Sequence, residues 1–194
     1  MGHTSPVLPV LVWLAAAGAT PVFTNPMPAS PPAVRRSSDC AVRPDGGGGV
    51  TDEFITYGGF NGAVLQDVPY YRLLSNGWGS GVVVMPPARE RHSMAYDHES
   101  GFVAIVGGGN GFNVFANVTL INPANAVTAP VLPATRPSAR IDAALVWVPP
   151  LQQFLYFGGS ANVFGTSHMN DLWSLEVADG GVTWKALAIG PSLP

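Results

Sequence analysis

The sequence predicts an all-β protein built from repeated four-stranded antiparallel sheets. Short apolar runs rich in β-branched and aromatic residues recur at a spacing of about 50 residues, and a pair of glycines follows each run. The 23 glycines and 19 prolines among 194 residues favour tight turns and interrupt long helices. Because 47% of the residues are apolar and only 11% are charged, the sheets are expected to stack on one another.

A glycine pair ends the second expected strand of each repeat. The pairs are Gly58-Gly59, Gly107-Gly108 and Gly158-Gly159. They follow the apolar runs 54–57, 102–106 and 154–157. Runs of this length and composition predict buried strands. Glycine lets the chain bend sharply there and lets neighbouring backbone come close.

A proline-led arginine precedes the first expected strand of each repeat. The arginine-containing stretches are 32–36, 87–91 and 137–140. The strands that follow them are expected at 39–42, 93–96 and 143–146. We expect Arg91 and Arg140 to be buried in structural hydrogen bonds, and His92 to be a structural residue at the start of its repeat. Cys40, the single cysteine, is expected to be a small residue on a buried strand.

Two further strands complete each repeat. The third strands are expected at 66–71, 117–121 and 170–175. Asp67 and Asp171 occupy matched positions there and suit turn caps. Trp78 and Trp184 mark fourth strands in the first and third repeats, whereas the middle repeat lacks this tryptophan and offers only the weak run 127–132. The first repeat carries an extra turn at 45–49.

Together these features resemble the kelch repeat. The resemblance is most specific in the third repeat, where Arg140, the glycine pair, the run Asn170-Asp171-Leu172-Trp173 and Trp184 follow in order. It spans residues 36–194, divided as 36–90, 91–139 and 140–194. It implies one blade of four antiparallel strands per repeat, arranged radially around a channel. The expected fold is therefore a kelch-type β-propeller of three blades in an incomplete ring, since closed rings have about four to eight blades.

The N-terminal region has the composition of a secretory signal. Residues 1–34 contain no charged side chain, and the apolar run 7–19 ends in small residues. We therefore expect a signal peptide at 1–19 and a proline-rich lead-in at 20–35, which makes the protein secreted. The alternative is that the run is a strand or a loop of the propeller in a cytoplasmic protein. For a secreted protein, Asn117 in the sequon Asn117-Val118-Thr119 is a candidate glycosylation site.

Several classes of function are disfavoured by composition and spacing. Nine basic residues against twelve acidic ones give a net charge of −3, without the basic surface that nucleic-acid binding needs. The run 7–19 is too short to span a membrane. The four histidines lack the spacing of a metal site, and the Gly107–Gly111 region lacks a phosphate-binding motif. We expect no metal and no cofactor.

The sequence carries no catalytic motif, so we expect a non-catalytic binding module with a protein or glycan partner. In kelch propellers, the loops between the second and third strands share a face with the segments between blades. The loops of that face are expected at 60–65, 109–116 and 160–169, and the segments between blades at 86–91 and 133–140. The candidate binding residues on it are Asn110, Phe112, Asn113, Phe115, Asn162 and Phe164. The apolar outer faces of the terminal blades also predict self-association.

The alternative function is a fragment of a secreted copper oxidase similar to galactose oxidase, which also uses a kelch-type propeller. Such enzymes need tyrosines, histidines and a cysteine–tyrosine cross-link around copper. Cys40, Tyr57, Tyr96 and His92 supply these residue types but form no recognisable motif.

Overall fold

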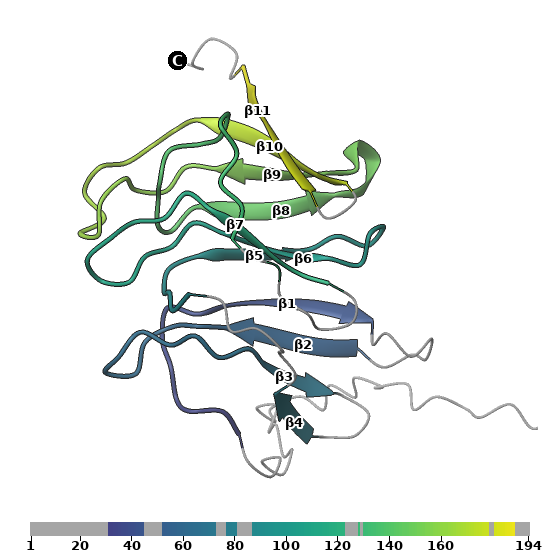
Figure 1. Ribbon diagram of the computed structural model, residues 1–194, viewed down its shortest axis with the longest axis vertical. Coiled ribbons are helices and arrows are strands. Elements are labelled where there is room, and N and C mark those ends of the chain that lie inside the picture. The colour runs from purple at the N-terminus through teal and green to yellow at the C-terminus, as the bar shows by residue number, and fades with distance from the viewer. Residues whose placement is uncertain are drawn as a thin grey trace, which may run out of the picture.

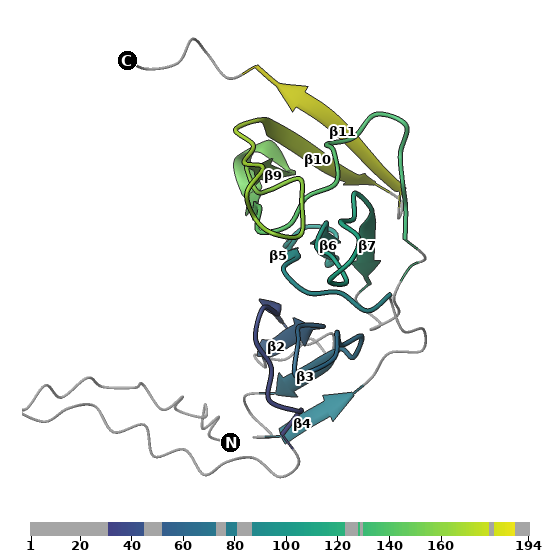
Figure 2. The same ribbon diagram turned by 90° about the vertical axis from the view of Figure 1, so that its left-hand side faces the viewer.

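A computed structural model of the chain describes residues 31–44, 52–72, 77–80, 87–122, 128, 130–178 and 181–188. These residues form three antiparallel sheets and no α-helix. The sheets follow one another along the longest axis of the molecule and do not close into a ring (Figures 1 and 2). This confirms the predicted all-β propeller blades in an incomplete ring. The candidate signal peptide, most of the proline-rich lead-in and the turn at 45–49 lie outside the described residues.

The first sheet, blade 1, is a meander of four strands. These are β1 (Asp39–Pro44), β2 (Asp52–Tyr57), β3 (Pro69–Arg72) and β4 (Gly77–Ser80), hydrogen-bonded in that order. In the β3–β4 pair, Tyr71 lies opposite Trp78 with the ring centroids 5.3 Å apart. Cross-strand aromatic pairs of this kind stabilise an edge strand, and the fourth strand expected around Trp78 is confirmed.

Blade 3 repeats this meander with longer outer strands. Its strands are β8 (Ala144–Val148), β9 (Gln153–Phe157), β10 (Leu172–Ala178) and β11 (Gly181–Leu187). One turn of 3-10 helix, η1 (Pro149–Leu151), joins β8 to β9. Leu175 lies opposite both Phe154 and Trp184, so these three side chains form one buried row across the sheet.

Blade 2 lies between the other two and has three strands in the described part of the chain. They are β5 (Ser93–Tyr96), β6 (Val103–Val106) and β7 (Val118–Ile121). Where a weak fourth strand was expected, a single bridge forms, in which Val131 and Val118 exchange two backbone hydrogen bonds. Pro130 and Pro133 flank this bridge. Because proline has no N–H to donate, Pro133 cannot continue the ladder on one side; on the other side, the Thr128 N–H donates to the Leu120 carbonyl at 2.8 Å.

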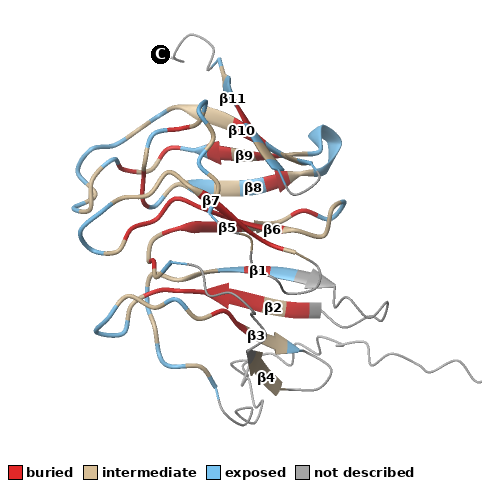
Figure 3. Cartoon of the chain, viewed as in Figure 1, coloured by how far each residue is buried: buried red, intermediate tan, exposed pale blue. Residues whose placement is uncertain are grey.

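Blade 2 is buried on both faces because it is packed between two sheets. Successive side chains of a strand point to opposite faces. On β6, Val103 and Ile105 pack toward blade 1, whereas Ala104 and Val106 pack toward blade 3. All four are at most 1% exposed. Figure 3 shows burial concentrated in this central sheet and in the strands that face it, so the core consists of two apolar clusters, one at each junction.

The outer faces of blades 1 and 3 are exposed. Ala41 points toward blade 2, so its neighbours Cys40 and Val42 lie on the outer face of blade 1, where both are exposed. The expected burial of Cys40 is therefore wrong, because no described sheet covers this face. On blade 3, Val146 and Phe157 are likewise exposed.

The same three backbone hydrogen bonds hold each junction between blades. They involve the segments that lead into each blade, residues 35–38, 89–92 and 140–143, which we call the leading segments. Between blades 1 and 2, the N–H groups of Gly59, Arg89 and Arg91 donate to the carbonyls of Arg89, Leu65 and Ser37. Between blades 2 and 3, the N–H groups of Gly108, Arg140 and Asp142 donate to the carbonyls of Arg140, Phe115 and Arg91. All six bonds measure 2.8–3.1 Å.

The first glycine of each pair is where the next blade comes closest. A Cβ atom on Gly58 would lie 2.3 Å from the Arg89 carbonyl oxygen, and one on Gly107 would lie 2.6 Å from that of Arg140. Both glycines also have positive φ, 56° and 66°. Glycine is thus required by space and by backbone conformation.

Gly107→Ala is expected to lower the free energy of unfolding by at least ~3 kcal/mol, because a clash with the next blade adds to the strain of a positive φ. Gly111→Ala is the matched control, since its φ is +86° and a Cβ atom there would have nothing within 4 Å. It should cost only the conformational strain, about 1 kcal/mol. Urea unfolding of both variants measures the difference, and equal losses would contradict the role of the close approach.

Candidate functional site

One side of the molecule collects the loops that the sequence predicts to share a face. The β2–β3, β6–β7 and β9–β10 loops lie together on the left in Figure 1, opposite the β5–β6 and β8–β9 turns. We call this side, formed by the loops 60–65, 109–116 and 160–169, the loop face. The leading segments also reach this side, so residues far apart in sequence meet there.

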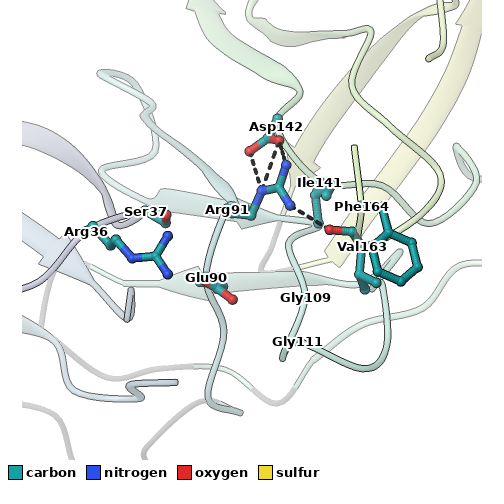
Figure 4. A pocket seen from close by; sticks show the side chains of 10 residues that line it. All are labelled: Arg36, Ser37, Glu90, Arg91, Gly109, Gly111, Ile141, Asp142, Val163 and Phe164. Carbon is teal, nitrogen blue, oxygen red and sulfur yellow. Dashed lines mark hydrogen bonds and ion pairs between the residues drawn. The ribbon is translucent and has the colours of Figure 1, made fainter. Parts of the chain in front are cut away.

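A cleft of about 560 Å³ opens on the loop face (Figure 4). Each leading segment contributes two residues to it. These are Arg36 and Ser37, Glu90 and Arg91, and Ile141 and Asp142. Gly109, Gly111, Val163 and Phe164 complete the lining from the β6–β7 and β9–β10 loops. The ranges predicted for this face contain Glu90, Arg91 and the four loop residues, but they do not contain the lining residues of the first and third leading segments, because those segments carry no shared cleft motif.

Three lining residues share an unusual backbone conformation. Ser37, Arg91 and Asp142 have φ values of 56°, 57° and 54°, although none is glycine. Each lies two residues after the arginine of its leading segment, and the backbone bonds between blades link them in order. Left-handed conformations cost free energy in residues other than glycine, so their recurrence marks one structural position of the repeat.

Arg91 joins blades 2 and 3 at the cleft. Its Nε atom lies 3.0 and 3.1 Å from the two carboxylate oxygens of Asp142, and its Nη2 atom also pairs with that carboxylate. Its Nη1 atom donates to the Val163 carbonyl oxygen at 2.7 Å. The hydrogen bond to Asp142 raises the pKa of Arg91. Arg91 therefore makes the expected structural hydrogen bonds, but its side chain is only partly buried, contrary to expectation.

Phe112 and Phe164 are the most exposed of the predicted binding residues. Their exposed fractions are 90% and 83%. Phe164 lines the cleft, and Phe112 follows the lining residue Gly111 on the adjacent loop. The two rings therefore lie on neighbouring loops of the loop face, with Phe164 in the cleft lining and Phe112 one residue beyond the lining residue Gly111.

The other predicted binding residues mostly hold their own loops. The Asn110 side-chain oxygen accepts hydrogen bonds from the N–H groups of residues 112 and 113. The Asn162 side-chain oxygen accepts a hydrogen bond from the Thr166 N–H, and its amide nitrogen donates to the Thr166 hydroxyl. Phe115 is half-buried, with the guanidinium of Arg89 5.3 Å from its ring centroid. Only Asn113 has an exposed side chain besides the two phenylalanines.

An arginine clamp repeats in all three blades. The Nη1 atoms of Arg35, Arg89 and Arg140 each donate to the carbonyl of the first glycine of their own blade's pair, at 2.9 Å every time. In blades 1 and 3, the guanidinium also binds both carboxylate oxygens of an aspartate. These aspartates are Asp67 and Asp171, so their role is to pair with arginine rather than only to cap a turn. The hydrogen bond from Arg140 lowers the pKa of Asp171 to about 2.

Blade 2 lacks the carboxylate of this clamp. The backbone carbonyls of Asp67, Asn117 and Asp171 each accept a bond from the first glycine of the pair, so Asn117 occupies the aspartate position. Arg89 is 0% exposed, and its Nε and Nη2 atoms have no partner among the described residues. Burial lowers its pKa. Arg89, rather than Arg91, is thus the counterpart of Arg140, and no carboxylate among the described residues pairs with its buried charge.

Asn117, the sequon residue, is half-buried directly before β7. Its side-chain oxygen is buried without a partner in the described part of the chain, and Thr119 of the sequon is fully buried within the strand. The glycosylation of Asn117 stays a prediction.

His92 and Tyr57 pack together in the junction between blades 1 and 2. Their ring centroids are 4.9 Å apart. Burial, reinforced by the charge of Arg89, lowers the pKa of His92 to about 3. Burial raises the pKa of Tyr57 to about 12, and the Tyr57 hydroxyl donates to the Pro87 carbonyl. His92 is therefore the structural residue that the sequence predicts, held as a neutral ring.

The residue types of a copper oxidase do not come together. Tyr57 and His92 meet in the first junction, but Cys40 lies on the outer face of blade 1 and Tyr96 packs against His98. Among the described residues, no three His, Cys, Asp or Glu side chains form a metal-binding group. The described part of the chain also contains no helix long and apolar enough to cross a membrane.

Three stacked antiparallel meanders with a cleft on the loop face define an open β-propeller. No family model and no curated protein matches the sequence. Solved structures do match the fold. One, described as "Structure of YjhT", matches 80% of this chain with a TM-score of 0.62 and 13% identity. The match covers 47% of that protein's chain, so this chain spans about half its length, and at this identity the similarity shows the fold alone.

Asn117→Asp is expected to stabilise the protein by about 1–2 kcal/mol, because it supplies the carboxylate that the buried Arg89 lacks. Urea unfolding at pH 7 measures the change. Asn113→Asp, on the exposed part of the preceding loop, is the matched control and should have no effect. A loss of stability in Asn117→Asp would contradict the clamp in blade 2.

The buried His92 makes the protein sensitive to acid. Because its pKa is about 3 in the folded chain and 6.5 ordinarily, the unfolded chain takes up a proton between these values that the folded chain excludes. Stability should therefore fall as the pH drops below about 6.5, by about 2 kcal/mol between pH 7.5 and 5. His92→Phe should remove this dependence in urea unfolding, whereas His168→Gln, at an exposed loop position, should keep it. Parent-like behaviour of His92→Phe would rule out the neutral buried ring.

Proposed function

We propose that this chain is a non-catalytic binding module of the kelch-repeat type that binds a protein or a glycan at its loop face. The observation that carries the proposal is the pair of exposed rings, Phe112 and Phe164, on adjacent loops beside one cleft. Single exposed apolar residues are common on protein surfaces, but aromatic rings gathered around a concave site are typical of binding surfaces.

The chemistry of the cleft supports a partner with both apolar and polar groups. Phe164 offers an aromatic face, and the cleft also contains the charged side chains of Arg36, Glu90, Arg91 and Asp142. The Arg36 side chain is exposed, with its guanidinium 4.8 Å from the Phe60 ring centroid. Aromatic and arginine side chains are enriched at interfaces, and a ring with nearby hydrogen-bonding groups also suits a sugar.

The arginine clamp supports the kelch assignment. In each blade, the arginine of the leading segment donates to the first carbonyl of the glycine pair. This bond gives a physical reason for arginine and the glycine pair to occur together in the repeat. The signal-like composition of residues 7–19 supports a place of action outside the cell.

The double substitution Phe112→Ala and Phe164→Ala should weaken binding to the partner at least ~10-fold, because aromatic anchors carry much of the binding free energy of such surfaces. Partners are isolated by affinity capture from the culture medium of the cells that produce the protein, and glycans are tested on an array. Titration of each bound partner then measures its affinity for the parent chain and for the variant. Unfolding should be unchanged, since both rings are exposed.

Leu151→Ala is the matched control for this experiment. Leu151 is an exposed apolar residue in the η1 turn, on the side opposite the loop face. This variant should keep full binding. If the double variant retained every partner while Leu151→Ala lost them, the binding surface would lie on the opposite side and the proposal would be wrong.

A further inference from the structure

We propose that two copies of this chain join head to tail, with the outer face of blade 3 in one copy packed on the outer face of blade 1 in the other, so that the two chains close one ring. This assembly lies beyond the proposed binding function, because it uses the sheet faces rather than the loop face. Three observations carry it: the composition of the two faces, the backbone groups without a described partner, and an open glycine.

The β8–β9 part of the outer face of blade 3 has the composition of an internal face, whereas the β10–β11 part carries the polar residues Ser174, Glu176, Thr183 and Lys185. By their place before the glycine pair, Phe157, Tyr57 and Val106 are equivalent residues. Tyr57 and Val106 face the next blade and are 0% and 1% exposed, whereas Phe157 faces no described blade and is 48% exposed. The same face carries Val146, opposite Leu155 in the β8–β9 pair. Burying such a face removes apolar surface from water, which stabilises association.

The outer face of blade 1 carries apolar residues at positions that are buried in the internal junctions. Val42 is exposed there, and its equivalent in blade 3 is Trp147, which is buried in the second junction. Phe54, on the same face, has the equivalents Val103 and Phe154, both fully buried. Phe54 and Trp78 form an edge-to-face aromatic pair, so this outer face is broad as well as apolar.

Among the described residues, the backbone groups that hold the two internal junctions have no backbone partner at the two ends. At an internal junction, the second glycine of the pair donates to the arginine of the next leading segment, and the carbonyl of residue 65 or 115 accepts from that arginine. In blade 3, the matching groups are the N–H of Gly159 and the carbonyl of Met169, which have no backbone partner among the described residues. The leading segment of blade 1 offers the complementary groups on Arg35.

Gly158 leaves the space that the docked arginine would fill. Its counterparts Gly58 and Gly107 are in close contact with the carbonyl of the following arginine, but a Cβ on Gly158 would meet only the Met169 carbonyl oxygen, at 3.5 Å. In the proposed dimer, the Arg35 carbonyl of the second copy lies against Gly158. The third junction then repeats the geometry of the other two.

Two copies would supply six blades, within the range of about four to eight that closes a propeller. The solved structure with the same fold has a chain of which this one covers 47%. Head-to-tail contacts form a closed ring only where the rotation between units closes. The resulting dimer has two identical junctions.

Sedimentation velocity of the full chain tests the assembly, with the result expected to be a species of twice the 20.2 kDa chain mass. Phe157→Asp and Val42→Asp should each raise the dissociation constant at least ~100-fold, because each places an unpaired charge in a junction. Leu151→Asp, equally exposed but outside the junctions, should leave it unchanged. All three residues are exposed in the single chain, so circular dichroism should show parent-like folding.

A mixture of Phe157→Asp and Val42→Asp separates head-to-tail pairing from other modes. One junction in the mixed dimer is free of substitutions, so the mixture should regain a dimer that neither variant forms alone. Gly158→Ala should also weaken the dimer by at least ~10-fold through its clash with the docked carbonyl, whereas Gly111→Ala should not. If the parent chain stays monomeric, these faces bind a partner other than a second copy. If the Val42→Asp variant still dimerises, the two copies pair through blade 3 alone. Either result, or an open series of larger species, would overturn the proposal.

Discussion

The structure depends on the contact between one arginine and two glycines in each repeat. The arginine side chain binds the first glycine's carbonyl in its own blade, and the arginine backbone binds the second glycine of the blade before it. A single residue therefore ties its own sheet to the preceding one. Because the contact brings backbone against backbone, any side chain at the first glycine would separate the sheets, and the apolar faces on either side would lose their packing.

Sequence reasoning succeeded where one periodicity determines the structure. The runs before the glycine pairs form strands, and Trp78 and Trp184 lie on the outermost strands of their blades. Sequence reasoning was less successful in predicting burial where the burial of a side chain depends on a neighbouring sheet. Cys40 lies on a strand of the predicted kind but on a face that no described sheet covers. Alternation along a strand shows that two faces exist, whereas it does not show which face has a neighbour.

The leading segments show a second limit of the sequence. Arg89 and Arg91 both lie in one short stretch, and only the backbone distinguishes them. Arg89 points into the junction, while the positive φ of Arg91 directs its side chain to the cleft. The equivalent positions hold serine, arginine and aspartate, so no residue type marks them. At the candidate site, likewise, the exposure of Phe112 and Phe164 follows from loops braced by asparagine side chains, which a list of residue types does not show.

Every strand pair in the three sheets joins strands that are consecutive in the chain. Each blade can therefore form hairpin by hairpin as the polypeptide leaves the ribosome, without waiting for distant residues. Its face toward the next blade, however, stays uncovered until that blade has been synthesised. For Ile55 and Tyr57, which end fully buried against blade 2, the covering residues are about 50 positions downstream. At about 5–20 residues per second, this apolar surface is open for roughly 3–10 s, long enough for a chaperone to bind the nascent chain.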